Sequence, residues 1–460
     1  MIKKPLHFYI AIFLMRVSIF ILKATGHQAT HVPGRVALAI CPKFLKYIDK
    51  PKKLIAITGT NGKTTVSNMI GDYFVMNNIP FAHNSLGSNI QEGIIVAVLQ
   101  ASTFFGKNKV PNMVLEVDER VSLKIYPFLK PDVLIVTNLF RDSYKRNAHV
   151  EFIKRILEEC IPLETTLVLN ADDILSSTLM PHNKRLYFGI SPLKGEAEKQ
   201  DCLIHDSKHC PYCDYPLTYT FTRYHHIGQA YCNVCGFKNA HADVLVQKVN
   251  KNTEQAIGVY KNKAFKFDFK ETSLMDLYNR LAMLTGLLAL DFDIHSIIKT
   301  LNTIKTVNTR YNETIVNGKK IVLMLAKDQN PIACSRVFDT ISQEKNERLG
   351  ILLINENHEN HRASENMAWY YDADFERLNK DHIKQVIEGG YRYKDFIVRA
   401  KLASIEPYKI DGAINEFLAA EKLDFTKIDT AYVLYGTKNM KEANQVRDRL
   451  IQKASKEATI

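Results

Sequence analysis

A glycine-rich segment near residue 60 contains the residue types that bind the phosphates of a nucleotide. It follows the apolar stretch Lys53–Thr58 and consists of Gly59, Thr60, Asn61, Gly62, Lys63, Thr64 and Thr65. The glycines permit a tight turn whose N–H groups point at phosphate oxygens. Lys63 then supplies a cation for the terminal phosphates and Thr64 a hydroxyl for Mg²⁺. A full P-loop has a further glycine where this chain has Ile57, so the segment is a shortened variant; a glycine turn with a surface lysine is the alternative.

Two close pairs of cysteines in the middle of the chain are Cys210, Cys213, Cys232 and Cys235. Their pattern is C-x2-C-x18-C-x2-C, and two such knuckles bring four thiolates to tetrahedral distance around Zn²⁺. We predict a structural zinc site, with an iron–sulfur site or a thiol redox pair as alternatives. The neighbouring His209, His225 and His226 are expected at the surface rather than as ligands.

The length and charge of the chain limit the classes of protein to which it can belong. The chain has 460 residues and a formal net charge of +12. This length exceeds a single hydrophobic core and predicts two or three domains. The positive charge favours an acidic partner, such as a nucleotide, a phosphorylated lipid, an anionic membrane or a nucleic acid, without choosing among them. The other four cysteines are scattered singly, which indicates a reducing compartment rather than a disulfide framework.

An apolar segment near the N-terminus, residues 8–22, resembles a signal or membrane segment. Arg16 interrupts it, the run is shorter than the ~20 residues that a span needs, and no small-residue cleavage site follows it. We therefore favour a packed or interfacial helix over a membrane span. We therefore predict a cytoplasmic protein that can also make peripheral contact with a membrane.

The first half of the chain alternates apolar strands with helical patterns, which is typical of a parallel sheet with crossover helices. The expected strands are Lys53–Thr58, Met113–Val117, Val133–Thr137 and Thr166–Asn170. The expected helices are Thr64–Asn77, Ile90–Leu99, Val150–Cys160 and Ser273–Leu290. A second α/β pattern has expected strands at Lys320–Leu325, Leu349–Ile354 and Thr430–Tyr435.

These patterns predict an α/β fold in three parts. Residues 1–48 form an N-terminal helical segment, and residues 49–308 form a doubly wound, mostly parallel domain that contains the phosphate loop. A zinc-ribbon insertion lies at about 200–240 within it. Residues 309–460 form a second, smaller α/β domain.

The segment Thr58–Thr65 resembles the ATP loop of the Mur ligases, the enzymes that add amino acids to peptidoglycan precursors. In that family an acid at the end of a later strand binds Mg²⁺. The matching segment here is Leu115–Glu119, so the resemblance implies Glu116 as a magnesium ligand together with Thr64. A hard divalent ion that bridges phosphates does prefer carboxylate and hydroxyl oxygens.

Three further residues match the same family in the same order along the chain. Asn138 lies in Thr137–Asp142, which resembles the family's strand-end loop beside the nucleotide. Asn279 resembles the asparagine that reads adenine. Arg310 resembles the linker arginine that faces ATP, although Thr309 replaces the usual glycine before it.

A zinc ribbon within a Mur ligase core resembles the MurT family, the synthetase subunits of lipid II isoglutaminyl synthase. Val32–Leu38 and Trp369–Glu376 resemble further motifs of that family. The resemblance implies ATP-dependent amidation of the D-glutamate α-carboxylate of the lipid II stem peptide to D-isoglutamine, through an acyl phosphate, with Lys63 and Glu116 in catalytic roles. It also implies a heterodimer with a glutamine amidotransferase (GatD-like) that supplies ammonia, lipid II at the inner membrane surface as the substrate, and no nucleic acid as a ligand.

The C-terminal part departs from the family. MurT proteins have an aspartate that serves the Cys-His pair of the partner, and Glu356 is the nearest carboxylate here, one methylene longer. The resemblance implies this catalytic role for Glu356; an ordinary loop residue is the alternative. The family's following Ala-Asp-Gly is absent, which leaves open a divergent paralogue that binds nucleotide and partner without amidation. A nucleic-acid-binding zinc-ribbon protein is a further alternative, which the nucleotide-site motifs disfavour.

Overall fold

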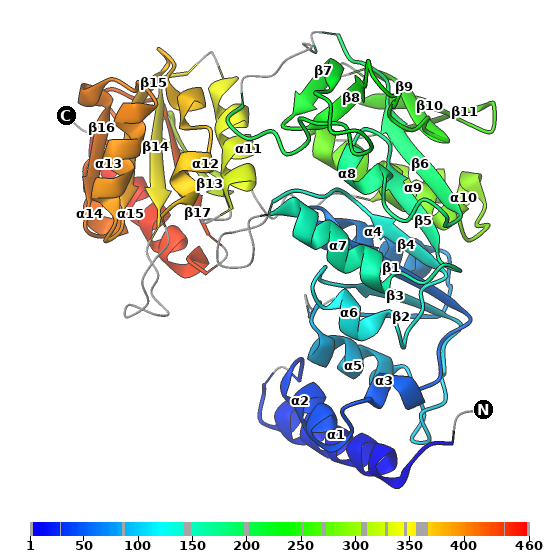
Figure 1. The fold of residues 1–460 in the computed structure, drawn as a ribbon. Coiled ribbons are helices and arrows are strands. Elements are labelled where there is room, and N and C mark those ends of the chain that lie inside the picture. The colour runs from blue at the N-terminus through cyan, green and yellow to red at the C-terminus, as the bar shows by residue number, and fades with distance from the viewer. Residues whose placement is uncertain are drawn as a thin grey trace. The chain divides into compact units, whose positions relative to one another are not determined.

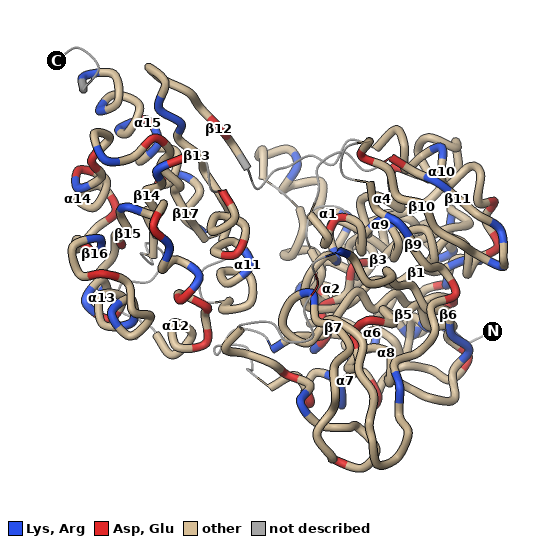
Figure 2. Tube along the Cα trace, turned by 90° about the horizontal axis from the view of Figure 1, so that it is seen from above, with Lys and Arg blue, Asp and Glu red and all other residues tan. Residues whose placement is uncertain are grey.

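Alternating strands and helices build two units, which Figure 1 shows as a ribbon. The computed structural model describes residues 3–27, 29–84, 88–141, 149–194, 196, 202–250, 253–268, 273–304, 311–326, 330–344, 347–355, 367–436 and 438–457. Unit 1 contains the described residues of 3–140, 149–196 and 206–304, and unit 2 contains the others. Lys and Arg are interspersed with Asp and Glu over both units, as Figure 2 shows.

A mostly parallel sheet forms the centre of unit 1. Its strands are β1 (Lys53–Thr58), β2 (Phe81–His83), β3 (Asn112–Glu116), β4 (Val133–Val136), β5 (Thr166–Asn170), β6 (Arg185–Ile190), β9 (Val244–Asn250), β10 (Gln255–Tyr260) and β11 (Lys263–Asp268). Their order is β11-β10-β9-β6-β5-β4-β1-β3-β2, and β9, β10 and β11 pair antiparallel. The central strands β1, β3, β4 and β5 are almost wholly buried, because helices cover both faces of a parallel sheet.

Two groups of helices cover the sheet of unit 1. One face carries α4 (Lys63–Met76), α9 (Leu274–Leu288) and α10 (Ile294–Thr303), which contact one another. A hydrophobic core on the other face joins strands β1 and β3 to α5 (Gln91–Gln100), α6 (Ser122–Ile125) and α7 (Val150–Cys160). The short α8 (Ile174–Ser177) follows β5.

Three N-terminal helices belong to unit 1. They are α1 (Leu6–Ala24), α2 (Val32–Ile40) and α3 (Phe44–Tyr47). α2 packs on α5 and α1 packs on α2, so these helices lie at one end of unit 1 (Figure 1). Phe8, Ile12 and Met15 of α1 have no exposed surface and join the same core as the sheet.

A two-stranded hairpin stands apart from the main sheet. It consists of β7 (Thr218–Tyr224) and β8 (Ile227–Tyr231), which pair antiparallel. The hairpin lies between β6 and β9 in the sequence, and β9 then returns to pair parallel with β6. The chain can therefore leave the sheet, form the hairpin and rejoin the sheet without breaking the parallel core.

Unit 2 contains a six-stranded sheet. Its strands are β12 (Tyr311–Val316), β13 (Lys319–Leu325), β14 (Leu349–Ile354), β15 (Ile383–Gly389), β16 (Ile410–Ala413) and β17 (Thr430–Tyr435). The order is β12-β13-β17-β14-β15-β16, with β12 antiparallel and the other pairs parallel.

Helices again cover both faces of this second sheet. One face carries α11 (Pro331–Ser342), α12 (Trp369–Asp372), η1 (Phe375–Leu378) and α13 (Tyr393–Leu402). The opposite face carries α14 (Glu416–Glu421) and α15 (Met440–Glu457). A short 3-10 turn, η2 (Pro407–Lys409), precedes β16.

The α/β fold class predicted from the sequence is confirmed. Four expected strands have the predicted bounds, and the other expected strands and helices agree to within two residues at each end. The agreement follows from the long apolar runs of buried parallel strands, which turn residues interrupt at both ends.

Candidate nucleotide site and cysteine cluster

The segment between β1 and α4 forms a tight loop with two left-handed glycines. Gly59 has φ 122° and Gly62 has φ 91°, conformations that residues with a Cβ rarely adopt. Space is also lacking: a Cβ on Gly59 would lie 2.3 Å from Thr137 Oγ1, and one on Gly62 would lie 2.3 Å from Asn279 Oδ1. The second contact brings Asn279 of α9 beside the phosphate loop.

Thr137 and Asn138, which follow β4, hold this loop by hydrogen bonds to its main-chain atoms. The Asn138 side chain accepts a hydrogen bond from Asn61 N at 3.1 Å and donates one to Asn61 O at 3.0 Å. Thr60 N donates to Asn138 O at 2.9 Å, and Thr137 Oγ1 donates to Asn61 O at 2.6 Å. Asn138 therefore holds the shape of the loop.

Lys63 lies at the first position of α4 and is paired with a buried carboxylate. Its Nζ is 2.5 Å from Gly59 O and 2.9 Å from Glu119 Oε1. The same Glu119 oxygen accepts from Gly59 N at 2.9 Å. Burial opposes the charged form of Lys63, but Glu119, Asp118 and Glu116 outweigh it and raise the pKa of Lys63 above its usual value.

Glu119 was missed as a site residue in the sequence, although it lies in the segment that contains Glu116. Only 7% of Glu119 is exposed. Burial raises its pKa, against the opposing effect of Lys63. A signal was available, because a loop lysine that is buried needs a compensating carboxylate nearby.

The start of α4 has the donors that an anion requires. Gly62 precedes the helix, and no side chain among the described residues caps its first turn. The N–H groups of a helix N-terminus attract phosphate, and Lys63 adds a full positive charge. Thr64 is exposed and Thr65 half-buried at this end. These groups fit the phosphates of a nucleotide.

Glu116 ends β3 at the same edge of the sheet as the loop. β1 and β3 pair in parallel with Ile57 opposite Glu116, two residues before Gly59. The Glu116 carboxylate accepts from Asn89 Nδ2 at 3.1 Å. Asn84 fixes its main chain by accepting from Glu116 N at 2.9 Å and donating to Glu116 O at 2.8 Å. A carboxylate beside a phosphate loop fits the oxygen ligands that Mg²⁺ prefers.

Two of the predicted site residues, Arg310 and Glu356, lie outside the described residues. The described chain stops just before Glu356 at Asn355, which follows β14 and is 3% exposed. The roles implied for both residues remain predictions.

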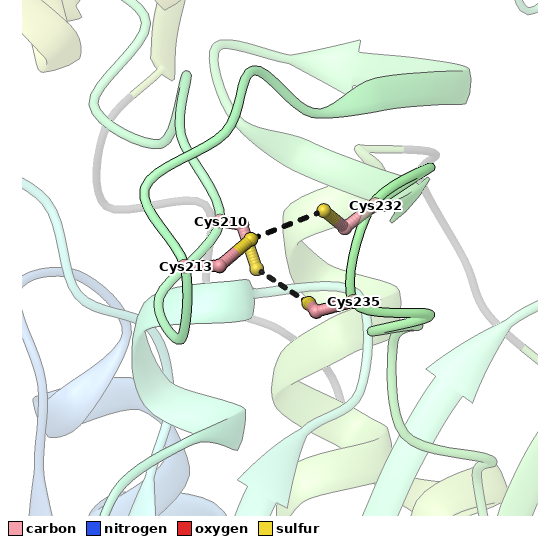
Figure 3. A group of neighbouring side chains, drawn as sticks. All are labelled: Cys210, Cys213, Cys232 and Cys235. Atoms are coloured by element: carbon pink, nitrogen blue, oxygen red, sulfur yellow. Dashed lines mark hydrogen bonds between the residues drawn. The ribbon is translucent and has the colours of Figure 1, made fainter.

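The four cysteines of the two pairs meet at the base of the hairpin, as Figure 3 shows. Their sulfur atoms all lie within 4.8 Å of one another. Cys210 Sγ is 3.4 Å from Cys235 Sγ, and Cys213 Sγ is 3.5 Å from Cys232 Sγ. Four sulfur atoms this close together could hold a metal ion.

The two cysteine knuckles have matching main-chain turns. Cys210 N donates to Tyr215 O at 2.8 Å, and Cys232 N donates to Phe237 O at 2.9 Å. Each turn has a left-handed residue after its second cysteine, Asp214 with φ 58° and Gly236 with φ 74°. The turns thus hold both cysteines of each pair on one side, independently of the side chains.

A buried arginine joins the hairpin to the core of unit 1. Arg223 of β7 donates through Nη1 to Asp172 Oδ2 at 2.7 Å and to Tyr278 OH at 2.5 Å. Its Nη2 donates to Ile190 O at 2.7 Å, and its Nε donates to Glu196 Oε1 at 2.6 Å. The side chains of Arg223 and Asp172 have no exposed surface. Tyr278 directly precedes Asn279, so this network leads to the phosphate loop.

The prediction that His225 and His226 lie at the surface was wrong. They are 3% and 0% exposed, because the turn of the hairpin docks on the main domain. His226 Nε2 lies 3.2 Å from Asp173 Oδ1, and its ring lies 4.6 Å from that of Phe140. Asp173 also accepts from Leu139 N at 2.8 Å, next to the loop-bracing Asn138. His209 is exposed as expected.

Comparison with known proteins places the chain in a family. Residues 57–209 match the Mur ligase middle domain, and residues 327–437 match the MurT ligase C-terminal domain. The lipid II isoglutaminyl synthase (glutamine-hydrolyzing) subunit MurT of Staphylococcus aureus (strain COL) is 31% identical over 400 residues, covering 86% of this chain and 88% of that protein. The chain belongs to the MurT family. The MurT subunit of Streptococcus pneumoniae (strain ATCC BAA-255 / R6) is 26% identical over 430 residues, covering 91% and 92% of the two chains.

Solved structures show that this MurT-family chain has the Mur ligase fold. The pseudomurein peptide ligase type C from Methanothermus fervidus superposes with a TM-score of 0.64 at 19% identity, covering 90% of this chain and 84% of that chain. MurF from Acinetobacter baumannii has a TM-score of 0.61 at 13% identity, covering 91% and 80%. Mur ligases use ATP and Mg²⁺, so this member of the family is an ATP-dependent ligase.

The Arg223 network generates a stability prediction. We expect Arg223→Ala to lower the free energy of unfolding by about 3–5 kcal/mol, because it leaves the buried Asp172 carboxylate without its counter-charge. Urea denaturation followed by far-UV circular dichroism measures the loss. The exposed Arg155 of α7 is a matched control, and its replacement by alanine should change stability by less than about 0.5 kcal/mol. Equal losses in the two variants would contradict an anchoring role.

Proposed function

We propose that the chain is the synthetase subunit of a lipid II isoglutaminyl synthase. It amidates the D-glutamate α-carboxylate of the lipid II stem peptide to D-isoglutamine at the expense of ATP. The observation that carries the proposal is the largely buried Lys63 ammonium, held between Gly59 O and Glu119 at the edge of the sheet where Glu116 ends β3. The names of the MurT relatives in two species support the choice of substrate.

The proposed reaction has two steps, because a carboxylate is a poor electrophile. An oxygen of the D-glutamate carboxylate bonds to the γ-phosphorus of ATP, the bond to the bridging oxygen breaks, and ADP leaves. Ammonia then bonds to the acyl carbon and loses a proton. The bond between that carbon and the phosphate oxygen breaks, and inorganic phosphate leaves with the electron pair. The product is the primary amide.

Lys63, Thr64 and Glu116 act on the first step. Lys63 Nζ binds the terminal phosphates and compensates the charge that spreads over the transferring group. Thr64 and Glu116 would hold Mg²⁺, which would neutralise phosphate charge. Asn279 is assigned to the nucleotide base and Arg310 to ATP, as the family resemblance implies.

Glu119 positions Lys63 in this proposal. A buried ammonium without a partner is costly, and Glu119 provides the partner before the nucleotide arrives. The phosphates then offer Lys63 a second set of anionic oxygens while Gly59 O and Glu119 keep the side chain aimed at the loop. Lys63 therefore needs little reorganisation to bind the nucleotide.

Ammonia comes from a separate glutaminase subunit of the GatD type that forms a heterodimer with this chain. Cys41, Cys160 and Cys334 are at most 7% exposed. Burial raises the pKa of Cys41, and it raises that of Cys160 to about 11, so their thiolates are disfavoured. A nucleophile for glutamine hydrolysis on the partner agrees with the description of the relatives as subunits of a glutamine-hydrolyzing synthase. The substrate places the complex in the cytoplasm at the inner membrane surface.

Purified chain with its glutaminase partner, ATP, glutamine and lipid II should yield amidated lipid II, detected by mass spectrometry. Lys63→Ala should reduce the rate about a hundredfold or more, because the cation for the transferring phosphate is lost. Lys130→Ala is the control, since Lys130 is an exposed residue paired only with Glu164 in the described structure. No product from the wild-type chain with a verified active partner would favour the nucleotide-binding paralogue without amidation.

Glu356 is proposed to orient the histidine of the partner's Cys-His pair. In the sequence it directly follows Asn355, which is buried and comes directly after β14. Glu356→Ala should reduce glutamine hydrolysis by the complex, measured as glutamate release, whereas Glu356→Asp should retain more of it. Intact hydrolysis in the alanine variant would remove Glu356 from the mechanism.

We also propose that the cysteine cluster holds one structural Zn²⁺. Four sulfurs within 4.8 Å of one another suit the tetrahedral site that zinc prefers. Metal analysis of the purified chain should find about one zinc per chain. Cys213→Ser should lose most of it, and Cys202→Ser, outside the cluster, should retain it. Iron with visible absorption, or a disulfide in place of metal, would contradict the zinc assignment.

A further inference from the structure

Helix α1 has two apolar faces, of which only one is covered by unit 1. The covered residues are Phe8, Ala11, Ile12 and Met15, each with no exposed surface. The uncovered apolar residues, which we call the α1 stripe, are Leu6, Ile10, Phe13, Leu14, Val17, Phe20 and Ile21. Leu6 and Phe20 are exposed to 75% and 74%, and Phe13 to 53%.

The α1 stripe is continuous along the helix. Residues of an α-helix follow one another at about 100°, which puts the seven stripe residues on the side opposite to the four buried ones. The stripe runs from Leu6 at the start of α1 to Ile21 near its end. Soluble proteins rarely expose an apolar surface of this extent without a partner.

The loop that contains Phe104 and Phe105 is tied to the N-terminal segment. Lys4 Nζ donates to Phe105 O at 3.2 Å, and Arg16 Nη2 of α1 donates to Ser102 O at 2.8 Å. Phe104 and Phe105 are 45% and 64% exposed, so this loop adds exposed apolar residues to the same end of unit 1.

The length and apolar character of α1 would also suit a membrane span. Two observations argue against a span. The helix supplies Phe8, Ile12 and Met15 to the core of unit 1, and extraction would expose that core and the sites that the residues fill. Arg16 lies midway along α1 and is tied to Ser102 O on the protein side. The geometry suits a helix that lies flat, with one face on the protein and the other on a surface.

The charge of the N-terminal segment indicates which kind of surface the stripe contacts. Residues 3–50 contain eight Lys and Arg residues and a single acidic residue, Asp49. Lys3, Lys23, Arg35, Lys43 and Lys46 are exposed. A protein partner or a second copy of the chain would place no special demand on such a charge excess. An anionic lipid surface would, because it attracts basic residues that flank an inserted apolar face.

We propose that α1 docks unit 1 on an anionic lipid bilayer, with the α1 stripe inserted among the acyl chains and exposed lysines and arginines of the N-terminal segment at the headgroups. The helix lies in the plane of the membrane and does not cross it. The advantage of this docking rests on the proposed function, because docking would bring the chain to the membrane surface where its lipid-linked substrate is found. The docking itself requires neither ATP nor lipid II, so it can fail or succeed separately from the amidation reaction.

Sedimentation of the full chain with vesicles tests the proposal. We expect binding to phosphatidylglycerol-containing vesicles, weaker binding to pure phosphatidylcholine vesicles, and release by high salt. Phe13→Glu combined with Phe20→Glu should weaken binding at least about tenfold, because charge on the stripe opposes insertion. Val75→Glu combined with Leu163→Glu is the matched control: these residues are 65% and 67% exposed, and the control should bind like the wild type. Thermal unfolding of both variants checks that they are folded.

Four results would overturn the proposal. The first is absence of binding to the anionic vesicles, and the second is an equal loss of binding in the stripe and control variants. The third is a dimer of the wild-type chain in light scattering that Phe13→Glu with Phe20→Glu dissociates, without vesicle binding, because the stripe would then cover a second copy. The fourth is binding that resists both high salt and alkaline extraction, which would make α1 a membrane span.

Discussion

The largely buried ammonium of Lys63 needs a negative partner whether or not a nucleotide is bound, and the nucleotide end of unit 1 is organised around that need. Glu119 supplies the charge and also accepts from Gly59 N, so one carboxylate fixes both the lysine and the first turn of the loop. Asn138 and Thr137 fix the next residues through main-chain atoms. The loop is therefore shaped before any phosphate arrives, and binding energy need not be spent on ordering it.

A second buried charge explains how an inserted hairpin can be part of the same domain. Arg223 reaches from β7 to Asp172, Tyr278 and Ile190 O, and these three bonds are buried. Breaking such a pair is costly, so the hairpin is held in one place. Asp173 contacts both His226 of the hairpin and Leu139 N, and Tyr278 directly precedes Asn279, so the hairpin is tied to residues next to the phosphate loop.

The N-terminal helix α1 uses two apolar faces for two different contacts. α1 buries one face in the core that also covers the sheet, and it presents a second apolar face outward. A helix that only completed a core would have a polar outer face. The combination lets a single element contribute to stability and to contact with an apolar surface, and the basic residues around it determine which surfaces suit it.

The sequence alone determined the elements whose signals are local. The apolar runs of β1, β5, β14 and β17, the glycines that begin the phosphate loop and the spacing of the cysteine pairs each depend on residues close together in the chain. Tertiary structure decided the rest. Glu119 faces Lys63 only because β3 lies beside β1, and Arg223 and His226 are buried only because the hairpin folds back on the turn after β5. Burial of a charged or polar side chain depends on contacts between distant segments, and those contacts have no pattern in the local sequence. The same holds for α1, where composition showed an apolar helix but packing decided which face remains uncovered.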